Sequence, residues 1–348
     1  PPPRPRPAAH PQIDHDMNQR KFGRTGLPVS ELCLGAMQFG WLTNDETSRA
    51  ILDAYRAAGG NFIQTTTCGP AAAGPGLCRS EEILGAWLRE NPRARDSLVL
   101  STRMRFARPA PGFRAGLADS IRRQCEESLR RLHTTHLDLL VIEWSDALLP
   151  MDDVLGCIDD LVRAGKLRYV GAAGFPVWRF MESLGRSARR GGGRLESFQA
   201  DYSLLERAPF EPDAVELARE YRVALLAQSP LAGGFLTGFY HVPQFPETAR
   251  TRRLRERYGN VRGHAVLATL GDIAVELGAT TGQVALAWVL TRSCVTAPML
   301  GFLAPEQVRE AAAATNLGLS PEHLDRLEAA SRRLPGVIEH SFTETTQP

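Results

Sequence analysis

The sequence predicts a single (β/α)8 barrel, and three observations support this fold class. From Leu32 onward, eight short apolar or β-branched runs alternate with amphipathic stretches, an alternation typical of parallel βαβ units. The runs are too apolar to face water, which favours a closed barrel over an open sheet. A chain of 348 residues with 43% hydrophobic content is also of ordinary length for one such barrel.

The elements follow from the apolar patterns. The expected strands are Leu32–Gly35, Asn61–Thr65, Leu98–Arg103, Leu137–Glu143, Leu167–Ala173, Ser197–Ser203, Val223–Ser229 and Val295–Leu300. The expected helices are Glu46–Ala58, Ser80–Arg89, Gly116–Leu132, Met151–Ala164, Pro176–Ser187, Asp213–Glu220, Val266–Leu277 with Gly282–Leu290, and Pro305–Thr315. Ser80 and Ser320 are predicted N-caps, because each precedes a carboxylate in the first turn of a helix pattern.

We expect a disordered leader over residues 1–19, one barrel over residues 20–335 and a tail over residues 336–348. The start of the chain is rich in proline and has no apolar stretch, which argues against a secretory signal; Met17 is a candidate native start. A net charge of +2 gives no reason to expect nucleic acid or a membrane as a partner. The six cysteines contain no CxxC pair, so reduced thiols in a cytoplasmic protein are expected.

In a (β/α)8 barrel, chemistry takes place on the loops that follow the strands. The side chains expected at strand ends are Gln64, Arg103, Glu143, Ala173, Gly174, Tyr202, Ser229 and Phe302. Aromatic residues of the adjoining loops are expected to wall an apolar substrate pocket; they are Phe39, Trp41, Trp144 and Phe175. Metal-ligand spacing, a P-loop and a nucleophile elbow are absent from the sequence, so no metal is expected.

Several segments carry a family resemblance. They are Lys21–Ser30, Leu34–Gly40, Gly60–Ile63, Ser80–Gly85, Ser128–Leu132, Leu161–Gly171, Tyr202–Arg207 and Ser229–Gly238. In this order they resemble the aldo/keto reductases, from about Arg20 to about Arg332. The resemblance implies a (β/α)8 barrel that reduces carbonyls with NADPH.

The four catalytic side chains that the resemblance implies are all replaced. The family uses an Asp, a Tyr acid, a Lys that lowers the pKa of the Tyr, and a His. A hydride that reaches a carbonyl leaves an oxyanion, which needs a proton from a phenol activated by a cation. The corresponding positions hold Gln64, Cys68, Arg103 and Glu143. The only lysines, Lys21 and Lys166, lie away from the strand ends.

The resemblance also implies a cofactor site. Its nicotinamide and backbone contacts would fall on Gln199, Tyr202, Ser229 and Leu231, and its phosphate and adenine contacts on Gln307 and Glu310. The Ser-Asn pair of the family is Ala173-Gly174 here, and Phe302, Leu303 and Ala311 remove a hydroxyl, a cation and an amide from the phosphate site. A phosphate would therefore lose charge-assisted hydrogen bonds. We expect either no cofactor or weakly bound NADP.

Arg103 and Glu143 end neighbouring strands, so they are expected to meet. They form either a structural ion pair or a substrate-binding cation beside a general acid or base, whose pKa an aromatic-walled mouth would raise. An enone-reducing branch of the family also carries Glu at this position, but it keeps its Tyr and Lys. Cys68 is either a nucleophile or a tolerated loop residue. The arginine cluster 250–257 is either a solvated helix face or a clamp on an anionic ligand.

Three functions remain open at this point. The first is an enzyme of bacterial specialised metabolism that performs redox-neutral proton transfer on a small molecule by elimination, isomerisation or cyclisation. The second is a reductase of carbonyls or enones with a non-standard proton donor. The third is a non-catalytic binding or regulatory subunit. We rank them in this order. The substrate and the oligomeric state do not follow from the sequence.

Overall fold

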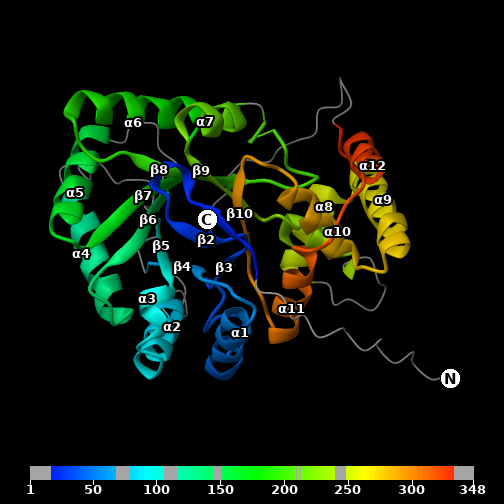
Figure 1. Ribbon diagram of the computed structural model, residues 1–348, viewed down its shortest axis with the longest axis horizontal. Helices are drawn as coiled ribbons and strands as arrows, with labels where there is room; N and C mark the ends of the chain where they lie inside the picture. The colour runs from blue at the N-terminus through cyan, green and yellow to red at the C-terminus, as the bar shows by residue number, and fades with distance from the viewer. Residues whose placement is uncertain are drawn as a thin grey trace.

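The computed structural model describes residues 17–67, 79–105, 116–143, 150–208, 210–211, 213–239 and 248–332. Its centre is a closed barrel of eight parallel strands in the order β10-β3-β4-β5-β6-β7-β8-β9. Helices surround this barrel on its outer side (Figure 1). The predicted fold class, a (β/α)8 barrel, is therefore confirmed.

The barrel strands lie close to their predicted positions. They are β3 (Cys33–Gly35), β4 (Phe62–Thr66), β5 (Val99–Arg105), β6 (Leu137–Glu143), β7 (Leu167–Ala173), β8 (Leu195–Asp201), β9 (Ala224–Gln228) and β10 (Val295–Leu300). Two strands differ by two residues: β8 ends at Asp201 where the sequence predicted Ser203, and β5 runs to Arg105 where the sequence predicted an end at Arg103. This longer strand pairs Arg105 with Glu143 of β6 in register.

The helices form the outer layer. They are α1 (Asp45–Ala57), α2 (Arg79–Glu90), α3 (Ala94–Ser97), α4 (Leu117–Arg131), α5 (Met151–Arg163), α6 (Val177–Arg190), α7 (Asp213–Tyr221), α8 (Ala249–Tyr258), α9 (Val261–Leu277), α10 (Thr281–Leu290), α11 (Pro305–Ala314) and α12 (Pro321–Ser331). Ser320 caps α12, because its side chain accepts from the backbone N–H of His323. The predicted cap Ser80 is wrong: α2 begins at Arg79, so Ser80 lies inside its first turn.

A short antiparallel hairpin, which the sequence did not predict, precedes the barrel. It consists of β1 (Gln19–Lys21) and β2 (Pro28–Ser30), and Figure 1 shows β2 across one end of the barrel. Phe22 and Val29 of this segment are buried in the cluster that fills the barrel interior. Met17 is also buried, and its N–H donates to the carbonyl of Ala58, so the fold includes residues that were expected to belong to the leader.

Two hydrophobic clusters hold the fold together. One lies between the outer faces of the strands and the helices. The other lies inside the barrel and includes Phe62, Val99, Leu139 and Leu226. Since side chains alternate along a strand, residues two or four positions further along these strands also point inward. This alternation sends Gln64, Ser101, Arg103, Glu143 and Gln228 toward the mouth of the barrel.

Within the described residues, no single helix is long and apolar enough to cross a membrane. Only the bent pair α9 and α10, at 96° to each other, reaches the required length and composition together.

Candidate active site

Hydrogen bonds between opposite strands close the interior of the barrel just below its mouth. β4 and β8 are four strands apart in the ring, as are β5 and β9. Gln64 of β4 and Gln199 of β8 are fully buried, and the amide nitrogen of each lies 3.3 Å from the amide oxygen of the other. Arg103 of β5 reaches across to β9, where its Nη1 donates to Oε1 of Gln228 at 2.7 Å.

Two further contacts join these pairs into one network. The amide of Gln199 also donates to Oε1 of Gln228 at 3.1 Å, and the amide of Gln64 donates to the hydroxyl of Ser101 at 3.2 Å. Buried amides with partners on both sides have little freedom to rotate. A ligand at this end of the barrel would therefore meet a floor of amides and one guanidinium.

Above this floor, one carboxylate lies between two arginines. Nε of Arg103 is 2.8 Å from Oε2 of Glu143, so these two residues meet as predicted. Arg105 forms a two-pronged pair with the same carboxylate, from Nε to Oε2 at 2.8 Å and from Nη2 to Oε1 at 2.9 Å. The side chains differ in exposure: 8% for Arg103, 19% for Glu143 and 63% for Arg105.

The charge state of Glu143 follows from these neighbours. Burial alone would raise the pKa of this carboxyl, but the hydrogen bond from Arg105 and the charges of Arg103 and Arg105 outweigh burial and lower the pKa. The raised pKa that the sequence suggested for Glu143 is therefore wrong. The physical reason is Arg105, a second cation within hydrogen-bonding distance. Glu143 is ionised at neutral pH and cannot act there as a general acid.

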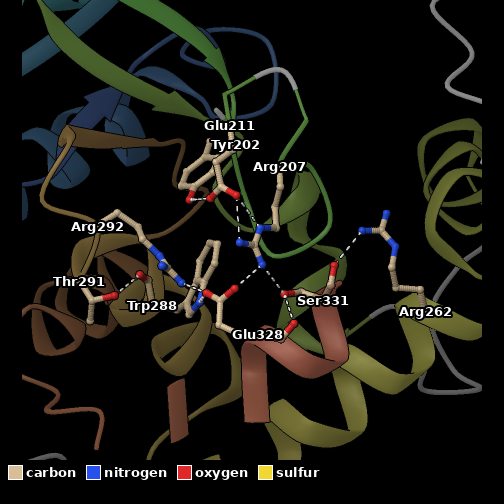
Figure 2. A network of polar contacts seen from close by, with 9 residues as sticks. All are labelled: Tyr202, Arg207, Glu211, Arg262, Trp288, Thr291, Arg292, Glu328 and Ser331. Carbon is tan, nitrogen blue, oxygen red and sulfur yellow. Dashed lines mark hydrogen bonds and ion pairs between the residues drawn. The ribbon is translucent and has the colours of Figure 1, made fainter. Parts of the chain in front are cut away.

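Tyr202 lies in a separate network, outside the mouth. Its ring is 1% exposed and stacks on Phe210 and Trp288, with centroids 4.3 and 5.5 Å apart. Its hydroxyl donates to Glu211 at 2.5 Å (Figure 2). Burial, and then the hydrogen bond to Glu211, raise the pKa of Tyr202. In this structure the ring of Tyr202 is not available to stack on a nicotinamide, and its hydroxyl is a poor proton donor.

The remaining predicted cofactor residues bind other parts of the chain. Oε1 of Gln307 accepts from the backbone N–H of Leu303 at 2.7 Å, and Oε1 of Glu310 accepts from the hydroxyl of Thr280 at 2.7 Å. Ser229 has a positive φ of 51°, and its carbonyl accepts from the N–H of Ala232 at the turn after β9. Leu231 follows in the same turn, as N-cap of the short helix η3 (Ala232–Thr237).

The aromatic residues predicted to wall the pocket differ in exposure. Phe39 and Phe175 are buried, at 0% and 7% exposure, whereas Trp41 is 62% exposed. Phe39 therefore packs in the core and presents no surface to a substrate, which corrects its assignment to the pocket. Trp144 and the candidate nucleophile Cys68 lie outside the described residues.

Two arginines of the α8 cluster form contacts with other segments of the same chain. Arg250 donates to the carbonyl of Gly233 at 3.0 Å, and Arg257 pairs with Glu206 at 2.7 Å. Arg257 also lies 4.0 Å from Asp201 at the end of β8. These contacts favour the structural interpretation of this segment over the anion clamp.

Two hollows in the described part of the chain lie away from the mouth. One, of about 610 Å³, runs between α6 and α7 beside Met181 and Leu217. The other, of about 300 Å³, lies beside Arg207 and Glu328. No group of three or more His, Cys, Asp or Glu side chains among the described residues could hold a metal ion.

Sequence reasoning missed three polar residues of the mouth: Arg105, Gln228 and Asp201. Strand alternation could have found Gln228 and Asp201, since each ends a barrel strand on the inward face. Arg105 required the correct end of β5. Its pairing with Glu143 is the contact that decides the charge state of the site.

Comparison with known proteins identifies the family. The family model of the aldo/keto reductases matches residues 31–332, so this chain belongs to the aldo/keto reductase family. "Uncharacterized oxidoreductase YrpG" of Bacillus subtilis (strain 168) is 34% identical over 317 residues, which cover 89% of this chain and 95% of that protein.

Two further relatives have other names. "Protein tas" of Escherichia coli (strain K12) is 29% identical over 342 residues, or 90% of this chain and 97% of that protein. "Probable voltage-gated potassium channel subunit beta" of Arabidopsis thaliana is 28% identical over 331 residues, or 92% and 98%. Relatives of similar coverage thus include both an oxidoreductase and a channel subunit by name.

Proposed function

We propose that this family member binds a small molecule at the mouth of the barrel and catalyses a redox-neutral proton transfer on it. The observation that carries the proposal is the Arg103–Glu143–Arg105 cluster. It occupies the strand ends where the family resemblance implies a lysine and a histidine. A guanidinium remains protonated, and an ionised carboxylate accepts protons rather than donating them. Neither group supplies the proton that must follow hydride transfer to a carbonyl.

Glu143 is the proton acceptor in this proposal. In an isomerisation, its carboxylate takes a proton from a carbon beside a carbonyl group, and the C–H electron pair moves into an enolate. A proton then returns from Glu143 to a second atom of the substrate, and exchange of the Glu143 proton with solvent before this step brings deuterium into the product in D2O. In an elimination, the electron pair instead expels a leaving group. Arg103, held against Gln228, is the cation that stabilises the enolate oxygen.

The cofactor side supports the proposal because its residues do not fit NADPH. Phe302 is buried and Leu303 is half-exposed, and neither side chain offers a donor to a phosphate. Gln307 and Glu310 are already engaged with Leu303 and Thr280. Gln199, the implied amide contact, is fully buried in the cross-barrel network. No step of the proposed reaction therefore passes through a nicotinamide.

Two other functions have specific support. The relative named as an oxidoreductase covers 89% of this chain, which favours a reductase with a non-standard proton donor. The relatives named as potassium channel subunits cover 92%, which favours a non-catalytic subunit. The ionised Glu143, with one exposed arginine beside it, favours proton transfer over both.

The proposal is tested by hydrogen exchange in D2O. The protein is incubated without nicotinamide with a panel of small keto acids, hydroxy acids and enones, and deuterium incorporation or product formation is followed by mass spectrometry. We expect at least one compound to react, and Glu143→Gln to abolish the reaction while the fold is retained. Turnover only with added NADPH, or full activity of Glu143→Gln, would contradict the proposal. Asp160→Asn, on the outer helix α5, is the matched control.

A further inference from the structure

Arg105 is a cation that a ligand can take over. Its side chain is 63% exposed, and within the described residues both hydrogen bonds of its guanidinium go to one carboxylate, that of Glu143. The planar fork of an arginine fits any carboxylate or phosphate in the same two-pronged way. An incoming anion could therefore replace Glu143 on Arg105 without loss of hydrogen bonds to this guanidinium.

Glu143 would keep a partner after such an exchange. Oε2 of Glu143 lies 2.8 Å from Nε of Arg103. The side chain of Arg103 is only 8% exposed. The carboxylate would therefore not be left buried without a counter-charge, a situation that is costly in proteins. The exchange moves an exposed arginine and leaves the buried pair in place.

Charge favours an anion here. The cluster has two guanidiniums and one carboxylate, a surplus of one positive charge. The acidic side chain of Asp201, at the end of β8, lies 4.0 Å from Arg257, which also pairs with Glu206.

From these contacts we propose that the ends of β5 and β6 bind a small anionic group, a carboxylate or a phosphate, and that this anion takes Arg105 away from Glu143. The substrate class is thus a small acid or a phosphate ester. The inference rests on the proposed function, since release of one arginine would leave Glu143 a stronger base only after the substrate has bound. Glu143 would then accept a proton from the same substrate molecule whose anionic group had drawn Arg105 away from it.

The test is direct binding, with no turnover and no nicotinamide. Acetate and inorganic phosphate are titrated separately into the full-length protein by isothermal calorimetry, at a constant ionic strength set with chloride. The variants are Arg105→Gln, Arg105→Lys and Glu143→Gln. Arg163→Gln is the matched control, because Arg163 is an exposed arginine of α5 that pairs with Asp160.

We expect saturable binding of at least one probe to the wild type. Arg105→Gln should weaken it at least tenfold, and Arg105→Lys should weaken it less, because the charge remains and the fork is lost. Glu143→Gln should strengthen it about tenfold, because the competing carboxylate is gone. Opposite effects of two variants in one cluster cannot both come from poor folding. Arg163→Gln should bind as the wild type does.

The probe that binds indicates the anionic group of the substrate: binding of acetate indicates a carboxylate, and binding of phosphate indicates a phosphate ester. No saturable binding of either probe to the wild type, or equal binding by Arg105→Gln, would overturn the inference. These results would leave the D2O exchange experiment unaffected, so a failed anion site and a failed proton-transfer function are distinguishable.

Discussion

Two clusters of arginine and glutamate in this barrel differ in charge balance and exposure. The network in Figure 2 sets Arg207 and Arg292 against Glu211 and Glu328. Arg207 bridges the two carboxylates, with Nε 3.1 Å from Glu211 and Nη1 2.6 Å from Glu328. Both arginines also lie over the ring of Trp288, at 5.4 and 4.2 Å. The charges of these four side chains balance, and the side chains tie the loop after β8 to α10 and α12. The third arginine drawn in Figure 2, Arg262, donates to the carbonyl of Ser331.

The mouth cluster is unbalanced. Arg103 and Arg105 share one carboxylate, and Arg105 is mostly exposed. Arginines without a matching number of carboxylates in a cleft keep some capacity for an external anion. An ion pair near a predicted active site is therefore most informative when one of its charges has no opposite charge to balance it. The closed network of Arg207, Arg292, Glu211 and Glu328 stabilises the fold. The Arg103–Glu143–Arg105 cluster is the candidate site.

The largest effect is expected at the centre of the closed network. Trp288 is fully buried, and Trp288→Ala should lower the free energy of unfolding by about 3–5 kcal/mol, because it leaves a cavity and removes two cation–π contacts. Denaturant unfolding measures this change. Trp178→Ala is the control: Trp178 is 60% exposed, and a loss of equal size there would refute the special role of Trp288.

Glu328→Gln should give the next largest effect. It leaves Arg207 and Arg292 without the carboxylate that both contact, at an expected cost of about 2 kcal/mol for this partly exposed group. Glu306→Gln, on the exposed face of α11 beside Arg309, is the matched control and should stay within about 0.5 kcal/mol. Equal losses in both variants would show that Figure 2 depicts an ordinary surface network.

Glu143→Gln should cost less stability, and the cost should depend on pH. The pKa of Glu143 is lowered in the folded chain, so its ionised form stabilises the fold above the unfolded pKa of about 4.3. This contribution is lost as pH falls through the folded pKa. Wild type and Glu143→Gln should therefore differ by about 1 kcal/mol at pH 7 and converge only once the pH has fallen below the folded pKa of Glu143. A constant difference across this range would contradict the ionised, paired state of Glu143.

The smallest change in stability is expected for Arg105→Gln. Because the Arg105 side chain is mostly exposed, its loss should alter the free energy of unfolding by less than about 0.5 kcal/mol. Thermal unfolding with and without acetate or phosphate separates the two roles of this residue. The wild type should gain stability from the anion and Arg105→Gln should not; a loss of stability above about 2 kcal/mol would place Arg105 among the structural arginines.

The sequence predicted the barrel well, because long apolar runs and helical periodicity are local signals. β6, β7 and β10 were predicted to the residue. It missed the β1–β2 hairpin, whose three-residue strands carry little periodic pattern.

The candidate site was predicted only in part. The meeting of Arg103 and Glu143 followed from adjacent strand ends. The contacts of Gln64 with Gln199, and of Arg103 with Gln228, join opposite sides of the barrel, and no local pattern encodes such contacts. The charge state of Glu143 depends on Arg105, which lies two residues beyond the predicted end of β5. This small error in a strand end reversed the predicted direction of the pKa shift of Glu143.

We propose that the mouth of this aldo/keto reductase barrel no longer serves hydride transfer from NADPH. The most direct measurement is a titration of the purified protein with NADPH and NADH, followed by intrinsic tryptophan fluorescence and by thermal shift. We expect no saturable binding of either nucleotide up to millimolar concentration. Saturable binding in the micromolar range, with a matching rise in the unfolding temperature, would contradict the claim and establish the reductase alternative.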